Sequence, residues 1–303
     1  MSKKVGIPRG LFYYQYFPLW KTFLEELGAE IVLSDYSNKR ILDNGVKNCV
    51  DEACLPVKLF HGHVLDIKDK VDYLFIPRFT SVSKGEYICP KFGGLPDMVR
   101  NTLKNLPPVI DAEVNLRKSR RNSFKAALEV GLNITENRVK IKKAYKKALV
   151  EYENYKKVVW SGVLPCDILR GKNTDTSLEG STIREWERST SLTKREDDKD
   201  TDYNVSTFSR LDTATGASTT NTVPAGSMLN IVIIGHVYNV YDSFINMELI
   251  EKLRRNYVNI ITIDTMDINL INKKSRLLNK KMFWNFGRKA LGCAFHILDR
   301  DDI

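Results

Sequence analysis

Cysteine and long apolar runs are both scarce in this sequence, and each shortage excludes a class of protein. Five cysteines are scattered over 303 residues, an odd and sparse set that does not suit the disulfide framework of a secreted domain. No apolar run approaches the roughly 18 residues of a membrane-spanning helix. The start, Met1–Pro8, has no apolar stretch before a cleavage site. We therefore expect a cytoplasmic protein without a membrane partner.

Several enzyme and nucleic-acid signatures are missing as well. The sequence has no G-x-x-x-x-G-K-S/T phosphate loop, no G-x-G-x-x-G after a strand, no H-E-x-x-H and no G-x-S-x-G. It also has no zinc-finger spacing, RNP-type motif or clear helix-turn-helix. The net charge of +10 therefore does not predict a nucleic-acid partner. An acidic protein surface or the phosphates of an acyl-CoA would use the same charge, and a solvated helix face explains basic runs such as Arg117–Arg121 equally well.

The N-terminal half alternates strand and helix patterns. Short apolar runs predict strands at residues 4–7, 31–33 and 71–76, with a further one at 107–110. Helical periodicity predicts a helix over 17–27, which Gly28 ends, and another over 57–66. A strand–helix–strand order with buried strands indicates an α/β fold with a parallel sheet covered on both faces.

Three segments follow from the rest of the pattern. Residues 1–165 are predicted to be an N-terminal α/β domain, with a helical hairpin from about 117 to 160. Residues 166–227 are predicted to be a disordered linker or insertion, because the polar stretch 171–226 has too few apolar residues for a core. Residues 228–303 read as the start of a second, incomplete α/β domain, with a buried strand at 229–234, a helix over 242–255, a strand at 260–263 and a helix over 283–298.

Two cysteines occupy positions suited to chemistry. Cys54 opens the helix predicted over 57–66, and a thiolate at a helix N-terminus is favoured by the dipole and the free N–H groups. Cys89 lies in a loop after the third strand, and such loops carry the sites of parallel α/β sheets. Both could therefore face one crevice. The alternative is that each is simply a small buried hydrophobe.

The other candidate ligands carry weaker signals. Cys49 and Cys54 form a C-x4-C spacing without the companion C-x2-C, and Cys166 and Cys293 are expected to be structural or incidental. His61 and His63 do not share a helix face, so local hydrogen bonding is a better interpretation than zinc binding. His236 directly follows a strand and is a better crevice candidate.

Several sequence blocks, in order, resemble the uncharacterised domain found with CoA-enzyme activases. That family is related to the 2-hydroxyacyl-CoA dehydratase D-component and to double-cubane cluster proteins. The blocks are Val5–Leu11, Phe17–Phe23, Glu26–Gly28, Cys54–Lys58, His61–His63, Tyr87–Lys91, Leu95–Met98 and Ile234–Asn239.

The resemblance implies flavodoxin-like α/β domains that hold an iron–sulfur cluster, of the 4Fe-4S or double-cubane type, in a protein of an anaerobe. It implies that Cys54 and Cys89 are two cluster ligands, and that a further cysteine would come from a second-domain element that this sequence does not reach. It implies an ATP-dependent activase partner supplying low-potential electrons, acyl-CoA as a possible ligand, and a homo- or hetero-oligomer. The competing prediction is a non-catalytic α/β interaction or regulatory module without a cluster. The residues do not decide whether the chain is an enzyme.

Overall fold

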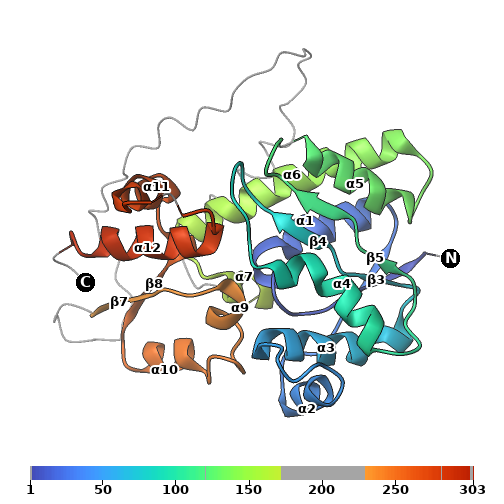
Figure 1. Ribbon diagram of the computed structural model, residues 1–303, viewed down its shortest axis with the longest axis horizontal. Helices are drawn as coiled ribbons and strands as arrows, with labels where there is room; N and C mark the ends of the chain where they lie inside the picture. Colours follow the sequence, from blue (N-terminus) through green and yellow to red (C-terminus); the bar gives the residue numbers. More distant parts are fainter. Residues whose placement is uncertain (1, 120, 172–228, 281, 301–302) are drawn as a thin grey trace. The chain divides into compact units, whose positions relative to one another are not determined.

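A parallel sheet forms the centre of the N-terminal part of the computed structural model, which describes residues 2–119, 121–171, 229–280, 282–300 and 303 (Figure 1). The sheet has the strand order β2-β1-β3-β5. In register, Val5 of β1 lies between Ile31 of β2 and Tyr73 of β3. The parallel, flavodoxin-like α/β fold predicted from the sequence is confirmed. Its strands are β1 (Lys4–Ile7), β2 (Glu30–Leu33), β3 (Tyr73–Phe75) and β5 (Val109–Ile110).

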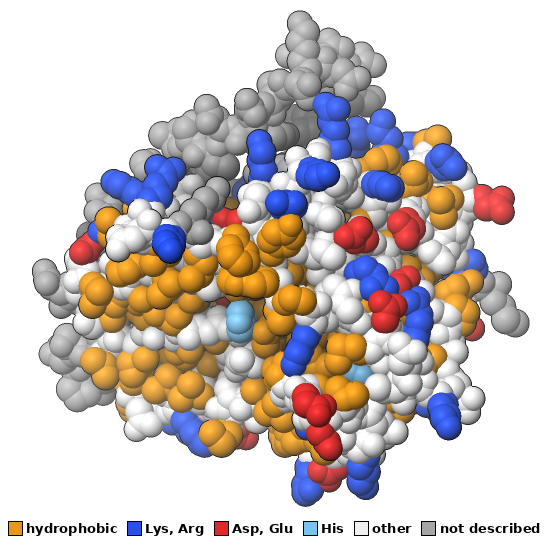
Figure 2. All heavy atoms as spheres, in the orientation of Figure 1, with side chains coloured by type: hydrophobic (Ala, Val, Ile, Leu, Met, Phe, Trp, Pro, Cys, Tyr) orange, Lys and Arg blue, Asp and Glu red, His pale blue; other side chains and the backbone are white. Residues whose placement is uncertain are grey.

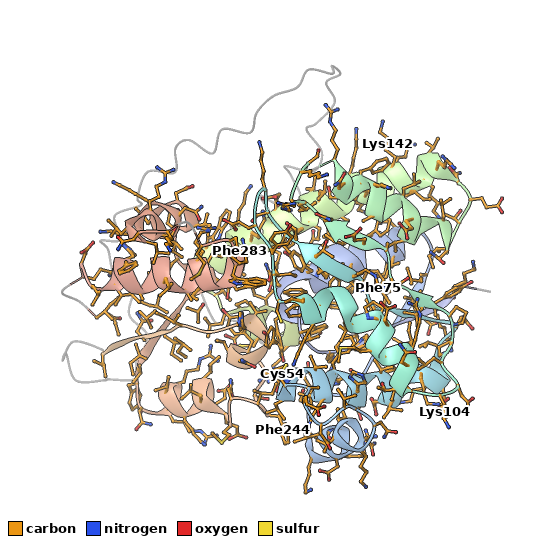
Figure 3. All side chains as sticks on the ribbon, viewed as in Figure 1. Cys54, Phe75, Lys104, Lys142, Phe244 and Phe283 are labelled. Carbon is orange, nitrogen blue, oxygen red and sulfur yellow. The ribbon has the colours of Figure 1, made fainter. Side chains whose placement is uncertain are left out.

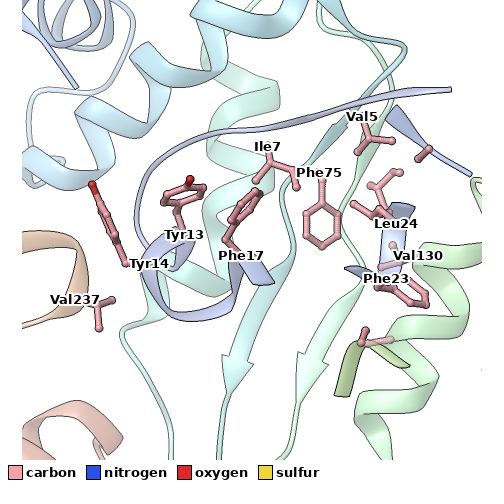
Figure 4. Packing of buried hydrophobic residues seen from close by; sticks show 14 of the residues in the cluster. Val5, Ile7, Tyr13, Tyr14, Phe17, Phe23, Leu24, Phe75, Val130 and Val237 are labelled. Carbon is pink, nitrogen blue, oxygen red and sulfur yellow. The ribbon is translucent and has the colours of Figure 1, made fainter. Parts of the chain in front are cut away.

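Helices cover both faces of this sheet. Their bounds are α1 (Tyr13–Glu26), α2 (Lys39–Lys47), α3 (Leu55–Ile67), α4 (Pro90–Thr102), α5 (Asn122–Leu132), α6 (Arg138–Trp160) and α7 (Pro165–Arg170), with a short 3-10 turn, η1 (Lys68–Lys70). One core joins Val5, Ile7 and Phe75 to residues of α1, α5 and α6 (Figure 4). A second core joins Leu74 and Ile76 to residues of α3 and α4. The alternation of neighbouring strand residues between these cores follows from the two-residue period of a strand.

The predicted helical hairpin is confirmed as α5 and α6, which pack against each other and, through α6, against α1. Lys and Arg side chains gather over these two helices on the face seen in Figure 2. A short pair of parallel strands, β4 (Arg78–Ser81) and β6 (Glu113–Asn115), precedes the hairpin and was not predicted.

The C-terminal segment contains a two-stranded parallel sheet, β7 (Asn230–Ile233) and β8 (Asn259–Thr262). The remaining elements are α9 (Val237–Val240), α10 (Leu249–Arg255), η2 (Ile263–Thr265), α11 (Ile268–Lys274), η3 (Ser275–Leu277) and α12 (Asn285–Ile297). Ile233 and Ile260 pack against the same core as β1 and α1, whereas Val232 and Ile261 pack with Cys293 of α12. The short sheet therefore uses the N-terminal core to bury one face.

Three predictions about local structure need correction. The helix expected over 17–27 begins at Tyr13 and continues through Pro18. The helix expected over 242–255 begins only at Leu249, because Met247 and Glu248 have left-handed backbone angles (φ 53° and 59°) that interrupt a right-handed helix. The strand expected to be buried at 229–234 is half-buried.

The predicted strand at 260–263 and helix over 283–298 correspond to β8 and α12. The linker prediction for 171–226 lies almost wholly outside the described residues, so the three-part division of the chain stays a prediction.

Candidate functional site

Cys54 is the N-cap residue of α3, at the end of that helix labelled in Figure 3. Its extended backbone (φ −67°, ψ 154°) lets its carbonyl accept hydrogen bonds from Val57 and Lys58 at 2.9 and 3.1 Å. Pro56 in the first turn suits the helix start, where its missing N–H has no helical partner to lose. The thiol makes no capping hydrogen bond and is exposed. It is therefore free to react or to bind a metal at the positive end of the helix dipole.

Cys89 repeats this arrangement on α4. It is the N-cap residue, Pro90 follows directly, and its carbonyl accepts a hydrogen bond from Phe92 at 3.0 Å. This thiol is also exposed and takes no part in capping. The prediction of a helix-start cysteine was made for Cys54 alone, because the periodicity after Cys89 is interrupted by Gly93, Gly94 and Pro96.

The structure brings the two helix starts together. The neighbours of both cysteines, Ala53 and Val57 on one side and Ile88 and Phe92 on the other, belong to one hydrophobic core. The Lys91 ammonium, in the first turn of α4, also donates to the carbonyl of Glu52, before α3, at 3.4 Å. Both Cys-containing blocks therefore lie close to each other, and the crevice that they were expected to face stays a prediction.

Tyr238 of α9 lies near both thiols. Burial raises its pKa above the ordinary range, and the nearby Cys54 and Cys89 raise it further. Its ring packs on Phe92 (centroids 6.0 Å apart) and stacks on His236 (5.1 Å). These two aromatic contacts, with Phe92 and His236, position the Tyr238 ring.

His236 is the N-cap residue of α9, directly after β7. Besides stacking on Tyr238, its ring meets Phe286 edge-on, with centroids 5.2 Å apart. Burial lowers its pKa, which favours the neutral imidazole. His236 therefore lies beside Tyr238, and its role as a crevice residue stays a prediction.

The backbone before Cys89 is held by the C-terminal segment. The Tyr87 N–H donates to the Phe283 carbonyl at 2.7 Å, and the Asn285 N–H donates back to the Tyr87 carbonyl at 2.8 Å. Next to this bridge, the Glu86 carboxylate accepts from Arg288 Nε at 2.6 Å and from Asn285 Nδ2 at 2.6 Å. Burial alone would raise the pKa of Glu86, but the hydrogen bonds, chiefly that of Arg288, lower it overall. We call Glu86, Tyr87, Phe283, Asn285 and Arg288 the α12 clasp.

The three other cysteines have different environments. Cys49 is half-buried near Cys54; burial raises its pKa and the Cys54 charge adds to that rise. Cys166 and Cys293 are buried, and burial raises the pKa of each to about 11. These properties agree with the structural role predicted for the last two.

His61 and His63 are fully buried in α3. His61 Nδ1 bonds to the Val57 carbonyl at 2.8 Å, one turn earlier, as the local hydrogen-bonding interpretation predicted. His63 instead reaches two serines, with Nδ1 2.9 Å from Ser34 Oγ and Nε2 3.0 Å from Ser37 Oγ. Among the described residues, no group of three or more His, Cys, Asp or Glu side chains is arranged to hold a metal ion.

Gly62, between these histidines, has a steric role. A Cβ at Gly62 would lie 1.9 Å from the Ile41 carbonyl oxygen, and one at Gly45 would lie 1.9 Å from that of Lys58. The backbones of α2 and α3 therefore touch at this pair of glycines. The Gly45 approach to the Lys58 carbonyl places α2 directly against the first turns of α3.

A parallel α/β protein with two free thiols at neighbouring helix starts is suited to thiolate ligation of a metal centre. The chain matches the CoA enzyme activase uncharacterised domain over residues 4–266, and it belongs to that family. No curated protein and no solved structure shows significant similarity to it. No helix among the described residues is long and apolar enough to cross a membrane.

Sequence reasoning missed two features of this site. Tyr238 lies within Ile234–Asn239 and was assigned no role, although its position two residues after His236 was a usable signal. In the α12 clasp, Glu86 bonds to Asn285 and Arg288, which lie 199 and 202 positions further along the chain, and no local pattern indicates such a pairing.

Proposed function

We propose that the chain holds an iron–sulfur cluster through Cys54 and Cys89, and that it serves an ATP-dependent electron-transfer system of the acyl-CoA dehydratase type. The observation that carries the proposal is the pair of exposed thiols, both at helix N-termini and both beside Tyr238. Two thiolates suit iron–sulfur ligation, and the helix dipoles would stabilise their charge. A bound cluster would supply one-electron transfer.

The chain's own residues would set the environment of that cluster. Tyr238 can donate a hydrogen bond toward sulfur, and hydrogen bonds to sulfur are one of the means by which proteins adjust cluster potential. His236 stacks on the Tyr238 ring, and Phe286 in turn packs edge-on against His236. The electron donor would be an activase that hydrolyses ATP, and an acyl-CoA would be the substrate of the wider system. The interaction module without a cluster is the competing function.

Anaerobic purification followed by iron and sulfide analysis tests the ligand assignment. We expect cluster content to fall by at least half in Cys54→Ser and in Cys89→Ser, and to stay unchanged in Cys166→Ser, whose thiol is buried away from the pair. Electron paramagnetic resonance, with the neighbouring activase and with or without ATP, tests the electron transfer. Unchanged cluster content in both Cys54→Ser and Cys89→Ser would show that these cysteines are not the ligands. A well-folded, metal-free protein after reconstitution would favour the interaction module.

A further inference from the structure

Most of the net charge of this chain is concentrated in the helical hairpin of α5 and α6. Residues 117–160 contain 13 Lys and Arg residues against four Asp and Glu. The rest of the chain contains 34 against 33, so it is close to neutral. On the face seen in Figure 2, the blue side chains gather over these two helices. Such a concentration creates a positive potential over one part of the surface, which solubility alone does not require.

The outer side of α6 carries this charge in a regular stripe. Seven residues follow one another at alternating intervals of four and three positions, which places them on one side of an α-helix. All seven are exposed, whereas Ile141, Ala148 and Tyr155 on the opposite side are buried. At about 1.5 Å per residue, the row runs for about 30 Å. We call it the α6 stripe, and its members are Val139, Lys143, Lys146, Val150, Glu153, Lys157 and Trp160.

The lysines of the α6 stripe have no counter-charge in the described part of the chain. The side chains of Lys143, Lys146 and Lys157 form no hydrogen bond or ion pair with a described residue. Glu153, the acidic member of the stripe, already pairs with Lys156 at 2.7 Å. The three lysines are therefore available to the carboxylates of a partner.

Apolar side chains interrupt the lysines of the α6 stripe. Val139 is 66% exposed, Val150 54% and Trp160 45%. Nucleic-acid phosphates would pair with the lysines but would leave these apolar side chains in water. A helix that lies in a membrane surface needs a continuous apolar face, and Lys143 and Lys146 break it. A protein surface offers both carboxylates and apolar contacts, so it fits the stripe best.

We propose that the α6 stripe is a docking surface for an acidic segment of another protein. Carboxylates of that segment would pair with Lys143, Lys146 and Lys157, and its apolar residues would pack on Val150 and Trp160. The spacing of the stripe suits a partner helix, because two packed helices present side chains to each other at intervals of three and four residues. This inference goes beyond the proposed function and holds whether or not the chain binds a cluster.

Photo-crosslinking of the full-length chain in cells of its native host tests the proposal. With p-benzoylphenylalanine in place of Val150, at the centre of the stripe, we expect one protein adduct, cross-linked through a peptide rich in Asp and Glu. Lys143→Glu combined with Lys146→Glu should reduce the adduct at least fivefold, and changing the same two lysines to Gln should reduce it less. The matched control, Lys70→Glu with Lys104→Glu, reverses two exposed lysines outside the hairpin and should leave the adduct unchanged.

Circular dichroism of each variant separates lost binding from lost folding, and if the reversed variant does not fold, the Gln variant must still reduce the adduct. The same photoreactive residue in place of Val46, an exposed valine of α2, should give no adduct that depends on the hairpin lysines. The proposal would be overturned by no adduct at Val150, by a cross-link to nucleic acid, to lipid or within the chain itself, or by a partner peptide without acidic residues. An adduct that survives the double charge reversal in folded protein would also overturn it.

Discussion

The Ser37 hydroxyl joins the imidazole of His63 to the carboxylate of Asp242. Ser37 donates its proton to Asp242 Oδ2, so the 3.0 Å contact with His63 Nε2 must have the imidazole as donor. Nδ1 is then the acceptor for the Ser34 hydroxyl at 2.9 Å, and Ser34 Oγ accepts the Arg9 N–H at 2.9 Å. One neutral tautomer of His63 satisfies every member of the network, which links the β2–α2 loop, α3 and the segment after α9.

Acid should destabilise the protein through His63. Burial lowers its folded-state pKa to about 4, with Asp66 and Arg9 acting on the ring in opposite directions, whereas the unfolded value is about 6.5. The unfolded chain therefore binds more protons between these values, and stability falls as pH drops from about 6.5 to 4, by up to about 3 kcal/mol. Burial raises the pKa of Asp242, so the folded protein takes up this proton before the unfolded chain does, which opposes part of the loss.

Urea denaturation at pH 7.5, 6 and 5 measures this loss. His63→Gln, which cannot titrate, should be less stable at pH 7.5 but should lose less stability on acidification. If the free energy of unfolding falls equally with pH in the wild type and in His63→Gln, the acid sensitivity comes from other groups.

Ser37→Ala should destabilise the chain by about 1–3 kcal/mol, because it leaves both the His63 N–H and a buried Asp242 oxygen without a partner. Ser161→Ala is the control; it removes an exposed hydroxyl that, among the described residues, bonds only to the nearby Val158 carbonyl, and it should cost under about 0.5 kcal/mol. Chemical denaturation at neutral pH compares them. Equal losses in the two variants would show that the network adds no stability.

Gly62→Ala should unfold or severely destabilise the chain, by more than about 3 kcal/mol, because the new methyl group would overlap the Ile41 carbonyl. Gly94→Ala makes the same change in α4, where nothing lies within 4 Å of the added carbon. There we expect a gain of about 0.5–1 kcal/mol from helix propensity. If the α2–α3 contact is as close as described, thermal melts should show a lower melting temperature for Gly62→Ala and a higher one for Gly94→Ala.

Glu86→Gln should loosen the α12 clasp, because it removes one charge of a pair whose side chains are only 10% and 14% exposed. Breaking such a pair costs about 3–5 kcal/mol when it is fully buried, and we expect the lower end here. Iodoacetamide labelling followed by mass spectrometry should show faster modification at Cys89, with Cys54 in the same molecule as the internal reference. A uniform change at both thiols would indicate global unfolding rather than release of the clasp.

The local features of the fold were predictable, and the long-range ones were not. Short apolar runs predict strands β1, β2 and β3, and the residues after Cys54 predict a helix start there. Each of these signals lies within a few neighbouring residues. His63 illustrates the limit: its partners Ser34, Ser37 and Asp242 come from distant positions, and no periodicity selects them. The break before Leu249 was missed because the Asp242 side chain caps the Phe244 and Ile245 N–H groups at 3.0 Å. This local alternative competes with a continuous helix.

The α12 clasp also bears on the order of events during synthesis. A ribosome releases Cys54 and Cys89 long before it reaches Phe283 and Asn285, whose backbone bonds to Tyr87 hold the approach to Cys89. Until then the Cys89 loop lacks two backbone hydrogen bonds, and Glu86 lacks its cationic partner. During that interval both cysteines have been synthesised, but the loop that carries Cys89 is not yet fixed. Any cofactor that needs both in fixed positions would therefore be acquired late, after the C-terminal segment has docked.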